Sequence, residues 1–309
     1  MQELHTRGCR IRALVKYNST NHCGWLEGVP GLSDIDVAAG DIRDPYFCDQ
    51  LMEGVDVVFN LAALIGIPYS YVAPHSYLEV NVGGTLNLCQ AALKHDVQRF
   101  VQVSTSEVYG TARSVPIAET HPLQPQSPYS ASKIGADSMA LAYYHSWNLP
   151  VVVARPFNTY GPRQSARAVI PSIISQILGG AGQVRLGDTR PTRDFSYVTD
   201  TCRGMLALAE ADPALGQVVN IGSGTEISIG DTAQLIQKII GREVEFLRDE
   251  QRIRPEGSEV FRLCCDPSRL RSLTNAKPQV GLEEGLQRTI DWLREPAHLA
   301  QFKTLQYNL

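Results

Sequence analysis

The sequence predicts an α/β protein built on a doubly wound, mostly parallel sheet, with a smaller α/β lobe attached. Short apolar segments of strand character alternate with longer segments of helical pattern through the first half of the chain, which is typical of a parallel sheet with helices on both faces. The 309 residues, of which 43% are hydrophobic, are enough for one large domain or two joined lobes. After about residue 165 the alternation becomes less regular, which indicates the second lobe.

The first half of the chain contains strands and helices in turn. Pro45 suits the first turn of a helix that runs to Met52, because its ring already has the backbone angle that this position needs. The predicted strands in this half lie at 9–15, 35–38, 56–60, 100–103 and 151–154, and the predicted helices at 45–52, 76–94 and 129–147.

The second half of the chain contains shorter elements. Ser228 is expected to cap the helix that follows it, and Cys264 and Cys265 are expected in a strand. The strand at 218–221 is expected to return to the main sheet. The predicted helices lie at 170–178, 199–211, 229–240 and 282–294, and the predicted strands at 183–186, 218–221 and 244–247. The expected division is a sheet domain at 1–165 and 196–225 and a smaller lobe at 166–195 and 226–309.

The composition excludes several classes of protein. A net charge of −4 argues against a nucleic-acid-binding protein, which normally carries a basic stripe. No apolar run has the ~18 residues of a membrane helix and no leader opens the chain, so a cytoplasmic protein is expected. The seven cysteines form no Cys-x-x-Cys pair, which indicates reduced thiols, and the seven histidines are scattered, so no metal site is expected.

The segment from Val101 to Lys133 carries the candidate chemistry. It opens with an apolar strand that leads into hydroxyl side chains and Glu107, at the strand end where open α/β sheets bind ligands. Tyr129 and Lys133 follow on a predicted helix, one turn apart on the same face. A phenol beside an ammonium is a tunable base, since the positive charge favours the phenolate and lowers a pKa that starts near ~10.

Seven motifs together carry a family resemblance. They are Asp41-Ile42 after a strand, Asn60-Leu-Ala-Ala63, Asn81-Val-Gly-Gly-Thr85, residues 104–110, Tyr129-x-x-x-Lys133, residues 155–162 and Arg193-Asp-Phe195. Over essentially its whole length the chain resembles the extended short-chain dehydrogenase/reductases, the NAD-dependent epimerase/dehydratase group that acts on nucleotide sugars. The Tyr-Lys pair alone is weak, because such pairs occur by chance on ordinary helices, but seven motifs in family order are specific. The resemblance implies a Rossmann-type sheet.

One motif of that family is absent from the sequence. The family begins with a strand, a Gly-x-x-Gly-x-x-Gly turn and a helix, whereas this chain begins with residues 1–8, which resemble the end of that helix. In the family's order the first strand is central. We therefore expect the strand at 9–15 to lack a neighbour and the cofactor pyrophosphate to lack its cradle. The chain is expected to be a truncated reading of a longer enzyme, or else a protein that compensates with a partner chain or a rearranged sheet.

The resemblance implies NAD as the cofactor. Asp41 resembles the carboxylate that accepts a hydrogen bond from the adenine amino group, although Gly-Asp is also a common turn pair. The segment after the first predicted strand has Lys16 and lacks the acid that NAD users often carry for the ribose, which leaves NADP possible. The implied cofactor-binding residues are Asp41, Ile42, Leu61, Ala62, Ala63, Asn81, Ser104, Tyr129, Lys133 and Phe157.

The resemblance also implies catalytic roles. Tyr129 takes the proton of a sugar hydroxyl, Lys133 lowers the pKa of Tyr129 and holds the nicotinamide ribose, and Thr105 hydrogen-bonds the same hydroxyl. By resemblance, many 4,6-dehydratases have the segment Thr-Asp-Glu at the position where this chain has Thr105-Ser106-Glu107. Glu107 is implied to remove the C5 proton and to assist loss of the C6 hydroxyl. Glu107 can alternatively serve only to cap the following segment.

Substrate residues are implied in the second half of the chain. Arg193 and Arg254 resemble the arginines that clamp the substrate diphosphate, and Arg262 is an alternative to Arg254, whose local sequence matches imperfectly. Asn158 is expected to bind the sugar or its phosphate, and Arg167 lies in an expected substrate-facing loop.

The sequences of residues 62–69 and 161–171 most resemble those of the UDP-N-acetylglucosamine 4,6-dehydratases of bacterial glycan pathways. The alternatives are UDP-glucuronate decarboxylation, C4 epimerisation, and a non-catalytic binding protein or inert fragment. A homodimer is implied, in which the helices at 76–94 and 129–147 of two chains form a four-helix bundle.

Overall fold

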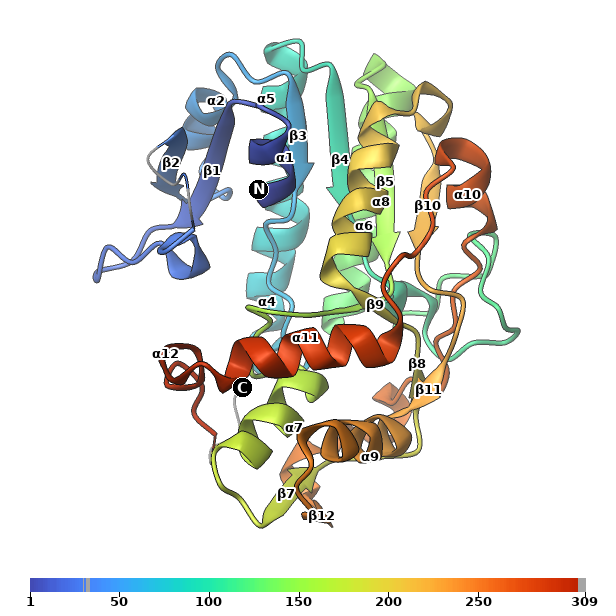
Figure 1. The fold of residues 1–309 in the computed structure, drawn as a ribbon. Coiled ribbons are helices and arrows are strands. Elements are labelled where there is room, and N and C mark those ends of the chain that lie inside the picture. The colour runs from blue at the N-terminus through green and yellow to red at the C-terminus, as the bar shows by residue number, and fades with distance from the viewer. Residues whose placement is uncertain (30, 32–33, 305–309) are drawn as a thin grey trace.

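A four-stranded parallel sheet forms the centre of the computed structural model, which describes residues 1–29, 31 and 34–304 (Figure 1). Its strands are β3 (Val57–Asn60), β4 (Arg99–Val103), β5 (Val151–Pro156) and β10 (Val218–Ile221), in the order β10-β5-β4-β3. All three pairings are parallel. The predicted return of the strand at 218–221 to the main sheet is confirmed.

Helices cover both faces of this sheet. Successive residues of a strand point to opposite faces, so Phe100 and Val151 pack in one core with α5 (Gly84–Lys94) and α6 (Pro128–Trp147). Val101 and Val152 pack in the opposite core with α8 (Val198–Glu210). All four of these strand side chains are fully buried. Burial on both faces explains why these strands are mostly apolar.

The sheet is interrupted beside β3. Strand β1 (Ile11–Lys16) pairs in parallel with β2 (Ile35–Gly40), and this pair forms a separate two-stranded sheet. Among the described residues, β1 has no strand partner on its other edge, and neither has β3 on the edge away from β4. The prediction that the strand at 9–15 lacks a neighbour is therefore confirmed. The short helix α1 (Gln2–Thr6) is connected to α8 by an ion pair between Arg7 and Glu210.

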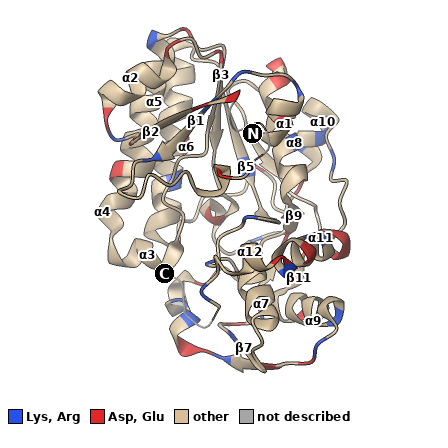
Figure 2. Ribbon diagram, turned by 60° about the vertical axis from the view of Figure 1, so that its left-hand side comes forward, with Lys and Arg blue, Asp and Glu red and all other residues tan. Residues whose placement is uncertain are grey.

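A smaller lobe lies beyond the carboxyl ends of the central strands (Figure 1). It is built from α7 (Val169–Leu178), β7 (Gln183–Leu186), α9 (Ile229–Ile240), β12 (Glu245–Arg248) and α11 (Leu282–Arg294), which share one hydrophobic core. The side chain of Ser228 accepts a hydrogen bond from the backbone N–H of Asp231, as expected of the cap of α9. Figure 2 shows basic and acidic residues interspersed over the elements of both parts of the molecule.

The remaining elements are short or lie at the edges. They are η1 (Gly24–Leu26), α2 (Pro45–Met52), α3 (Ile67–Val72), α4 (Pro74–Tyr77), η3 (Leu78–Gly83), η4 (Ser106–Tyr109), β6 (Asn158–Tyr160), β8 (Thr192–Arg193), β9 (Phe195–Tyr197), η5 (Asp212–Ala214), β11 (Ile227–Ser228), η6 (Glu250–Arg252), η7 (Glu256–Ser258), α10 (Ser268–Thr274) and α12 (Pro296–Leu299). None of the helices in the described part has both the length and the apolar character that a bilayer span requires.

The prediction of a strand at Cys264 and Cys265 is wrong. Cys265 makes only an isolated bridge with Ile117. Its backbone N–H donates to the Asp194 carboxylate at 3.0 Å, and the same carboxylate accepts from the N–H of Gly224 at 2.9 Å. A buried side chain thus accepts the hydrogen bond that a neighbouring strand would otherwise accept.

Candidate active site

The end of strand β4 places the first group of candidate residues. Ser104 follows the strand directly and donates a hydrogen bond to Asp137 of α6 at 2.5 Å. The chain then turns into η4, where the Thr105 hydroxyl accepts a hydrogen bond from the N–H of Glu107. This turn buries Ser106 and Glu107 at the carboxyl end of the sheet, where the sequence predicted the site. The cap of η4 is thus the Thr105 side chain, whereas the Glu107 side chain, which was alternatively expected to serve as a cap, forms an ion pair with Arg254.

Helix α6 brings Tyr129 and Lys133 to the same place. Pro128 and a capping box between Ser127 and Ser130 start the helix just before Tyr129. Tyr129 and Lys133 are both buried, with 7% and 4% of their surface exposed. The Lys133 ammonium donates to the carbonyl of Val103 at the end of β4, at 2.6 Å. The described part of the chain thus leaves two of the three ammonium donors for a ligand.

Burial is the largest influence on the pKa of Tyr129. Burial raises the pKa of Tyr129 above its usual range, and the negative charges of Glu107 and Asp137 raise it further, while a hydrogen bond with Thr105 opposes them. Burial lowers the pKa of Lys133. The pKa of Tyr129 in the chain by itself is therefore raised overall, and the lowering of this pKa by Lys133 stays a prediction.

A buried polar network lies behind these two residues. The Arg155 guanidinium contacts Asp137 at 2.9 Å, the Tyr109 hydroxyl at 2.9 Å and the Ser104 hydroxyl at 3.3 Å. Tyr109 in turn donates to Asn220 of β10 at 2.8 Å. The network therefore fixes α6 against the ends of β4 and β5. Sequence reasoning assigned no role to Asp137 or Arg155, although Asp137 lies one turn after Lys133 on the same helical face.

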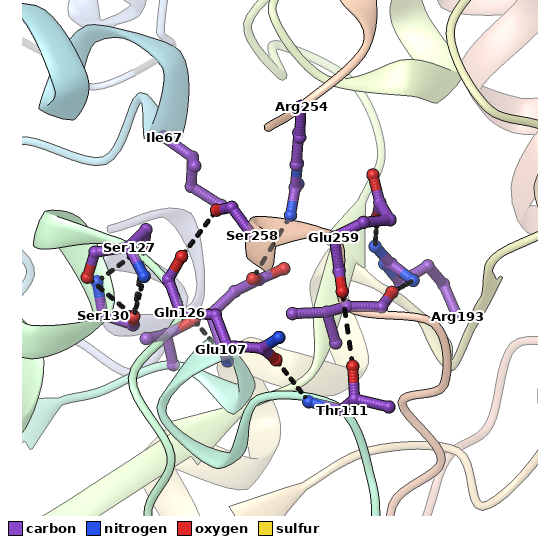
Figure 3. A network of polar contacts seen from close by, with 12 residues as sticks. Ile67, Glu107, Thr111, Gln126, Ser127, Ser130, Arg193, Arg254, Ser258 and Glu259 are labelled. Atoms are coloured by element: carbon purple, nitrogen blue, oxygen red, sulfur yellow. Dashed lines mark hydrogen bonds and ion pairs between the residues drawn. The ribbon is translucent and has the colours of Figure 1, made fainter. Parts of the chain in front are cut away.

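Two arginines and the carboxylate of Glu259 gather beside Glu107 (Figure 3). Arg254 Nη1 lies 3.5 Å from Glu107 Oε2, and Arg193 Nη2 lies 3.3 Å from Glu259 Oε1. Burial lowers the pKa of Arg193, and the charge of Arg254 adds to this effect. The pKa of Arg254 is raised, because the attraction of Glu107 and Glu259 outweighs its burial.

Arg254, and not its alternative Arg262, reaches this group. Arg262 forms an ion pair with Glu226 at a place where half of its side chain is exposed. Glu259 was missed by sequence reasoning because it follows Arg254 in an irregular segment, and only its partner Arg193 was singled out.

The candidate cofactor residues lie at the ends of β2, β3 and β5. Asp41 is paired with Arg43 at 2.7 Å, and this contact lowers the pKa of the carboxyl, in line with the turn reading. The side chain of Asn81 binds the backbone of Leu64 and the Ser132 hydroxyl, so it holds the loop after β3 against α6. The other candidates are Ile42, which is buried, Leu61, which is exposed, Ala62 and Ala63, which are half-buried, and Phe157, which is buried beside Tyr109.

The candidate sugar-binding residues lie on the other side of the site. The Oδ1 atom of Asn158 is buried and has no hydrogen-bond partner among the described residues, so it is suited to accept a hydrogen bond from a hydroxyl group of a ligand. Arg167 lies close enough to Tyr77 that its charge lowers the Tyr77 pKa, against the larger effect of burial, which raises it. Tyr77 packs edge-on against Tyr129 at 6.3 Å between ring centroids.

These residues fit one part of a dinucleotide better than another. Lys133 has two donors to offer a nicotinamide ribose, and Tyr129 lies beside it. The glycine-rich turn that would hold the pyrophosphate does not occur in the sequence. No group of three or more His, Cys, Asp or Glu residues suited to a metal ion occurs in the described ranges.

A sheet with helices on both faces, a Tyr-x-x-x-Lys pair at its carboxyl edge and a buried glutamate at a strand end fit an extended short-chain dehydrogenase/reductase. The family model described as GDP-mannose 4,6 dehydratase matches residues 1–289. The chain therefore belongs to the NAD-dependent epimerase/dehydratase family of these enzymes.

Relatives with known names agree with this assignment. A dTDP-glucose 4,6-dehydratase of Actinoplanes sp. is 36% identical, over 82% of this chain and 78% of the relative. The low-salt glycan biosynthesis protein Agl12 of Haloferax volcanii is 35% identical, over 82% of this chain and 80% of the relative.

Solved structures give the same picture. The dTDP-glucose 4,6-dehydratase DesIV of Streptomyces venezuelae, with NAD and TYD bound, matches with a TM-score of 0.86 and 29% identity, over 99% of this chain and 95% of that one. The UDP-glucuronic acid 4-epimerase of Bacillus cereus, with UDP-glucuronic acid and NAD, matches with a TM-score of 0.85 and 26% identity, over 95% and 94%. Dehydratases and epimerases are thus both among the neighbours.

Proposed function

We propose that the chain is an NAD-dependent nucleotide-sugar 4,6-dehydratase. The observation that carries the proposal is the position of Glu107, a buried carboxylate whose charge acts on Tyr129 in the same site. A 4-epimerase has to exchange hydride at one carbon only, whereas a dehydratase also needs a group that removes a second proton. Glu107 is suited to that additional step.

The residues divide the chemistry between them. Bound NAD would supply the hydride-transfer chemistry, first at C4 of the sugar and then at C6. Tyr129 takes the proton of the C4 hydroxyl, and Thr105 hydrogen-bonds that oxygen; positioned proton transfer contributes ~10²–10⁴-fold to a rate. The C4 ketone makes the C5 proton acidic, so Glu107 can remove it and pass it to the departing C6 hydroxyl. C5 regains one proton in exchange for the proton that Tyr129 took from the C4 hydroxyl and releases again, so the net change is the loss of one water.

Lys133 and the two arginines orient the ligands. Lys133 would hold the nicotinamide ribose with its two remaining donors. Arg193 and Arg254 would bind the substrate diphosphate, because guanidinium groups match paired phosphate oxygens. Asn158 would accept a hydrogen bond from the sugar, which supports its sequence-based assignment.

The preferred substrate within this proposal is UDP-N-acetylglucosamine. Ser106 occupies the position of the Asp in the Thr-Asp-Glu segment of many dehydratases. The sequences of residues 62–69 and 161–171 favour the N-acetylated sugar. The named relatives make dTDP-glucose the main alternative. The epimerase neighbours support C4 epimerisation as a second candidate reaction.

Mass spectrometry of nucleotide sugars tests the proposal. The chain is incubated separately with UDP-N-acetylglucosamine, dTDP-glucose, GDP-mannose and UDP-glucuronate, with NAD or NADP. We expect loss of one water from one sugar, and no such loss with Glu107→Gln. Loss of carbon dioxide from UDP-glucuronate, or a new isomer of unchanged mass, would establish a different reaction. No reaction of any sugar would contradict the proposal and favour the binding protein or inert fragment.

Two further proposals concern the architecture. The sheet domain is proposed to span 1–165 and 196–225, and the smaller lobe 166–195 and 226–309.

A homodimer through α5 and α6 is supported by apolar side chains that are exposed there, Leu86 by 37% and Trp147 by 55%. Light scattering after gel filtration should give twice the chain mass, and Leu86→Glu should give the monomer. A wild-type monomer at high concentration would contradict the dimer.

A further inference from the structure

The contact between Glu107 and Arg254 joins the two parts of the molecule. Glu107 lies on η4, directly after the central strand β4, whereas Arg254 lies between η6 and η7, in the segment that follows β12 of the smaller lobe. Figure 3 shows the Arg254 side chain pointing at the Glu107 carboxylate. A residue proposed to bind substrate phosphate is therefore paired with the residue proposed to act as base.

Arg254 is held much less firmly than Arg193. Arg193 donates to the carbonyls of Val260 at 2.7 Å and Thr192 at 2.9 Å, in addition to its ion pair with Glu259. In the described part of the chain, the Arg254 guanidinium makes one hydrogen bond, and this bond to Glu107 is 3.5 Å long. Arg254 can therefore turn to another anion at the cost of one long contact, while Arg193 stays in place.

The segment that carries Arg254 has its own anchor. The Ser258 hydroxyl donates to the carbonyl of Gln126 at 2.5 Å and also contacts the Tyr71 hydroxyl. These contacts hold the backbone four residues from Arg254 against the sheet domain. A turn of the Arg254 side chain therefore does not require the segment to leave the domain.

We propose that the Glu107–Arg254 pair is an autoinhibitory contact, which the diphosphate of the substrate releases by drawing Arg254 away from Glu107. In the paired state the guanidinium occupies the carboxylate oxygen Oε2 that would otherwise accept a proton. A diphosphate carries more charge than one carboxylate and offers the paired oxygens that a guanidinium prefers. The part played by Glu107 as base rests on the proposed dehydratase function, whereas the exchange itself rests on the ion pair alone.

The exchange makes the base available only when a nucleoside diphosphate is present. A free hexose or a hexose 1-phosphate lacks the diphosphate and leaves Arg254 on Glu107. Selection for nucleotide-linked sugars would then arise from activation of Glu107 as well as from binding. No covalent step is involved in this switch.

A double-mutant cycle on nucleotide binding tests the exchange without any measurement of catalytic activity. Binding of UDP and of dTDP to the full chain is measured by titration calorimetry, in the presence of NAD. Because Glu107 and the diphosphate compete for Arg254, Glu107→Gln should tighten binding about fivefold, within the usual range of coupling between sites. In the Arg254→Gln background the same Glu107 substitution should change the affinity by less than about twofold.

A second variant separates competition from simple charge repulsion. Glu107→Asp keeps the negative charge but shortens the side chain, so it weakens the ion pair and leaves the repulsion in place. Competition predicts tighter binding with Glu107→Asp, and repulsion predicts no change. If Arg254→Gln does not fold, Glu107→Asp alone still distinguishes competition from repulsion. Arg288→Gln, which removes a surface partner of Glu284 on α11, is the matched control and should leave nucleotide affinity unchanged.

Several results would overturn the exchange. Equal tightening by Glu107→Gln with and without Arg254 would mean repulsion, and no tightening would mean no competition. Failure of the wild-type chain to bind either nucleotide would also refute it. A positive cycle together with no loss of water from any sugar would refute the dehydratase and leave the exchange standing, while water loss with a negative cycle would do the reverse.

Discussion

Tyr129 combines a reactive group with a buried position. Its ring packs against Tyr77, and its hydroxyl lies beside Thr105. Tyr129→Phe removes only the hydroxyl and keeps the ring contact. We expect kcat to fall by ~10²–10⁴-fold, the usual contribution of positioned proton transfer. Steady-state assays with the accepted sugar measure the change, and nucleotide affinity serves as the control because it should stay the same. Turnover within tenfold of the wild type would contradict the role of Tyr129.

Asp137 belongs to a buried ion pair with Arg155, and both side chains are at least 95% buried because 5% and 3% of their surfaces are exposed. Asp137→Asn leaves the guanidinium buried without its countercharge, which typically costs about 3–5 kcal/mol. Urea unfolding should show a loss of this size.

Asp212→Asn is the matched control for Asp137→Asn. Asp212 pairs with Arg99, but 84% of the Asp212 side chain is exposed, so the free energy of unfolding should change by less than about 1 kcal/mol. Equal losses from the two substitutions would mean that burial of the pair does not matter.

The residues of the site were predictable where their spacing is local. Tyr129 and Lys133 lie one turn apart, and Thr105 to Glu107 follow a strand that is plainly apolar, so the sequence alone brings each set together. Arg254 and Arg262 could not be separated in this way, because the choice depends on which of two irregular segments reaches Glu107 across the lobes. The raised pKa of Tyr129 could not be predicted either, because it depends on burial in the folded chain, which the residues adjacent to Tyr129 in the sequence do not indicate.

Helices α2 and α5 each contribute one buried thiol to the same hydrophobic core. Burial raises the pKa of both Cys48 and Cys89 to about 12, with Asp44 and Asp41 contributing at Cys48. In the unfolded chain a thiol ionises near ~8.5. Below that pH both states hold the proton, and the stability is complete. Above it the unfolded chain loses protons that the folded chain keeps, so stability falls by about 1.4 kcal/mol per pH unit for each thiol.

Denaturant unfolding between pH 8 and pH 11 measures this slope. Cys89→Ala should make the slope shallower by about one thiol's share. Cys9→Ser changes an exposed thiol and should leave the slope as it is. A slope that is unchanged by Cys89→Ala would show that other groups, such as buried tyrosines, account for the pH dependence.

Elements with strong end signals were predicted to the residue. Helix α2 begins at Pro45 behind the cap Asp44, and α11 spans the predicted 282–294. The predicted helix at 76–94 is instead three consecutive helical segments, with the π-helical segment η3 in the middle. There Asn81 binds the loop after β3, so a tertiary contact changes the helical turn in a way that periodicity does not indicate.

The described part of the molecule has one four-stranded sheet and four two-stranded sheets, and the β1–β2 pair is one of these four. The β1–β2 pair has a small core of its own, formed by Ile11, Ala13 and Ile35. Such units open at lower free energy than a central strand such as β5, which is paired on both sides. Hydrogen exchange followed by mass spectrometry should therefore show amides of β1 and β2 exchanging at least about tenfold faster than those of β5. Equal protection would show that the two sheets open as one unit.

At this scale the sequence predicted the class of fold and the interrupted sheet, because both follow from the order of apolar segments and from one absent motif. The short strands β8, β9 and β11 and the helices α3 and α10 were not predicted, since they are stabilised by contacts between distant segments and carry little periodic pattern.

The interruption beside β3 has a mechanical consequence. Asp41 follows β2, while Tyr129 lies at the start of α6, and among the described residues no strand pairing joins the β1–β2 pair to the sheet that contains β4. The spacing of the two ends of the proposed cofactor site is therefore set by loops and helices, which deform more easily than a sheet. A rigid ligand that contacted both ends would hold the β1–β2 pair at a fixed distance from the four-stranded sheet. The molecule would therefore become less flexible on binding it.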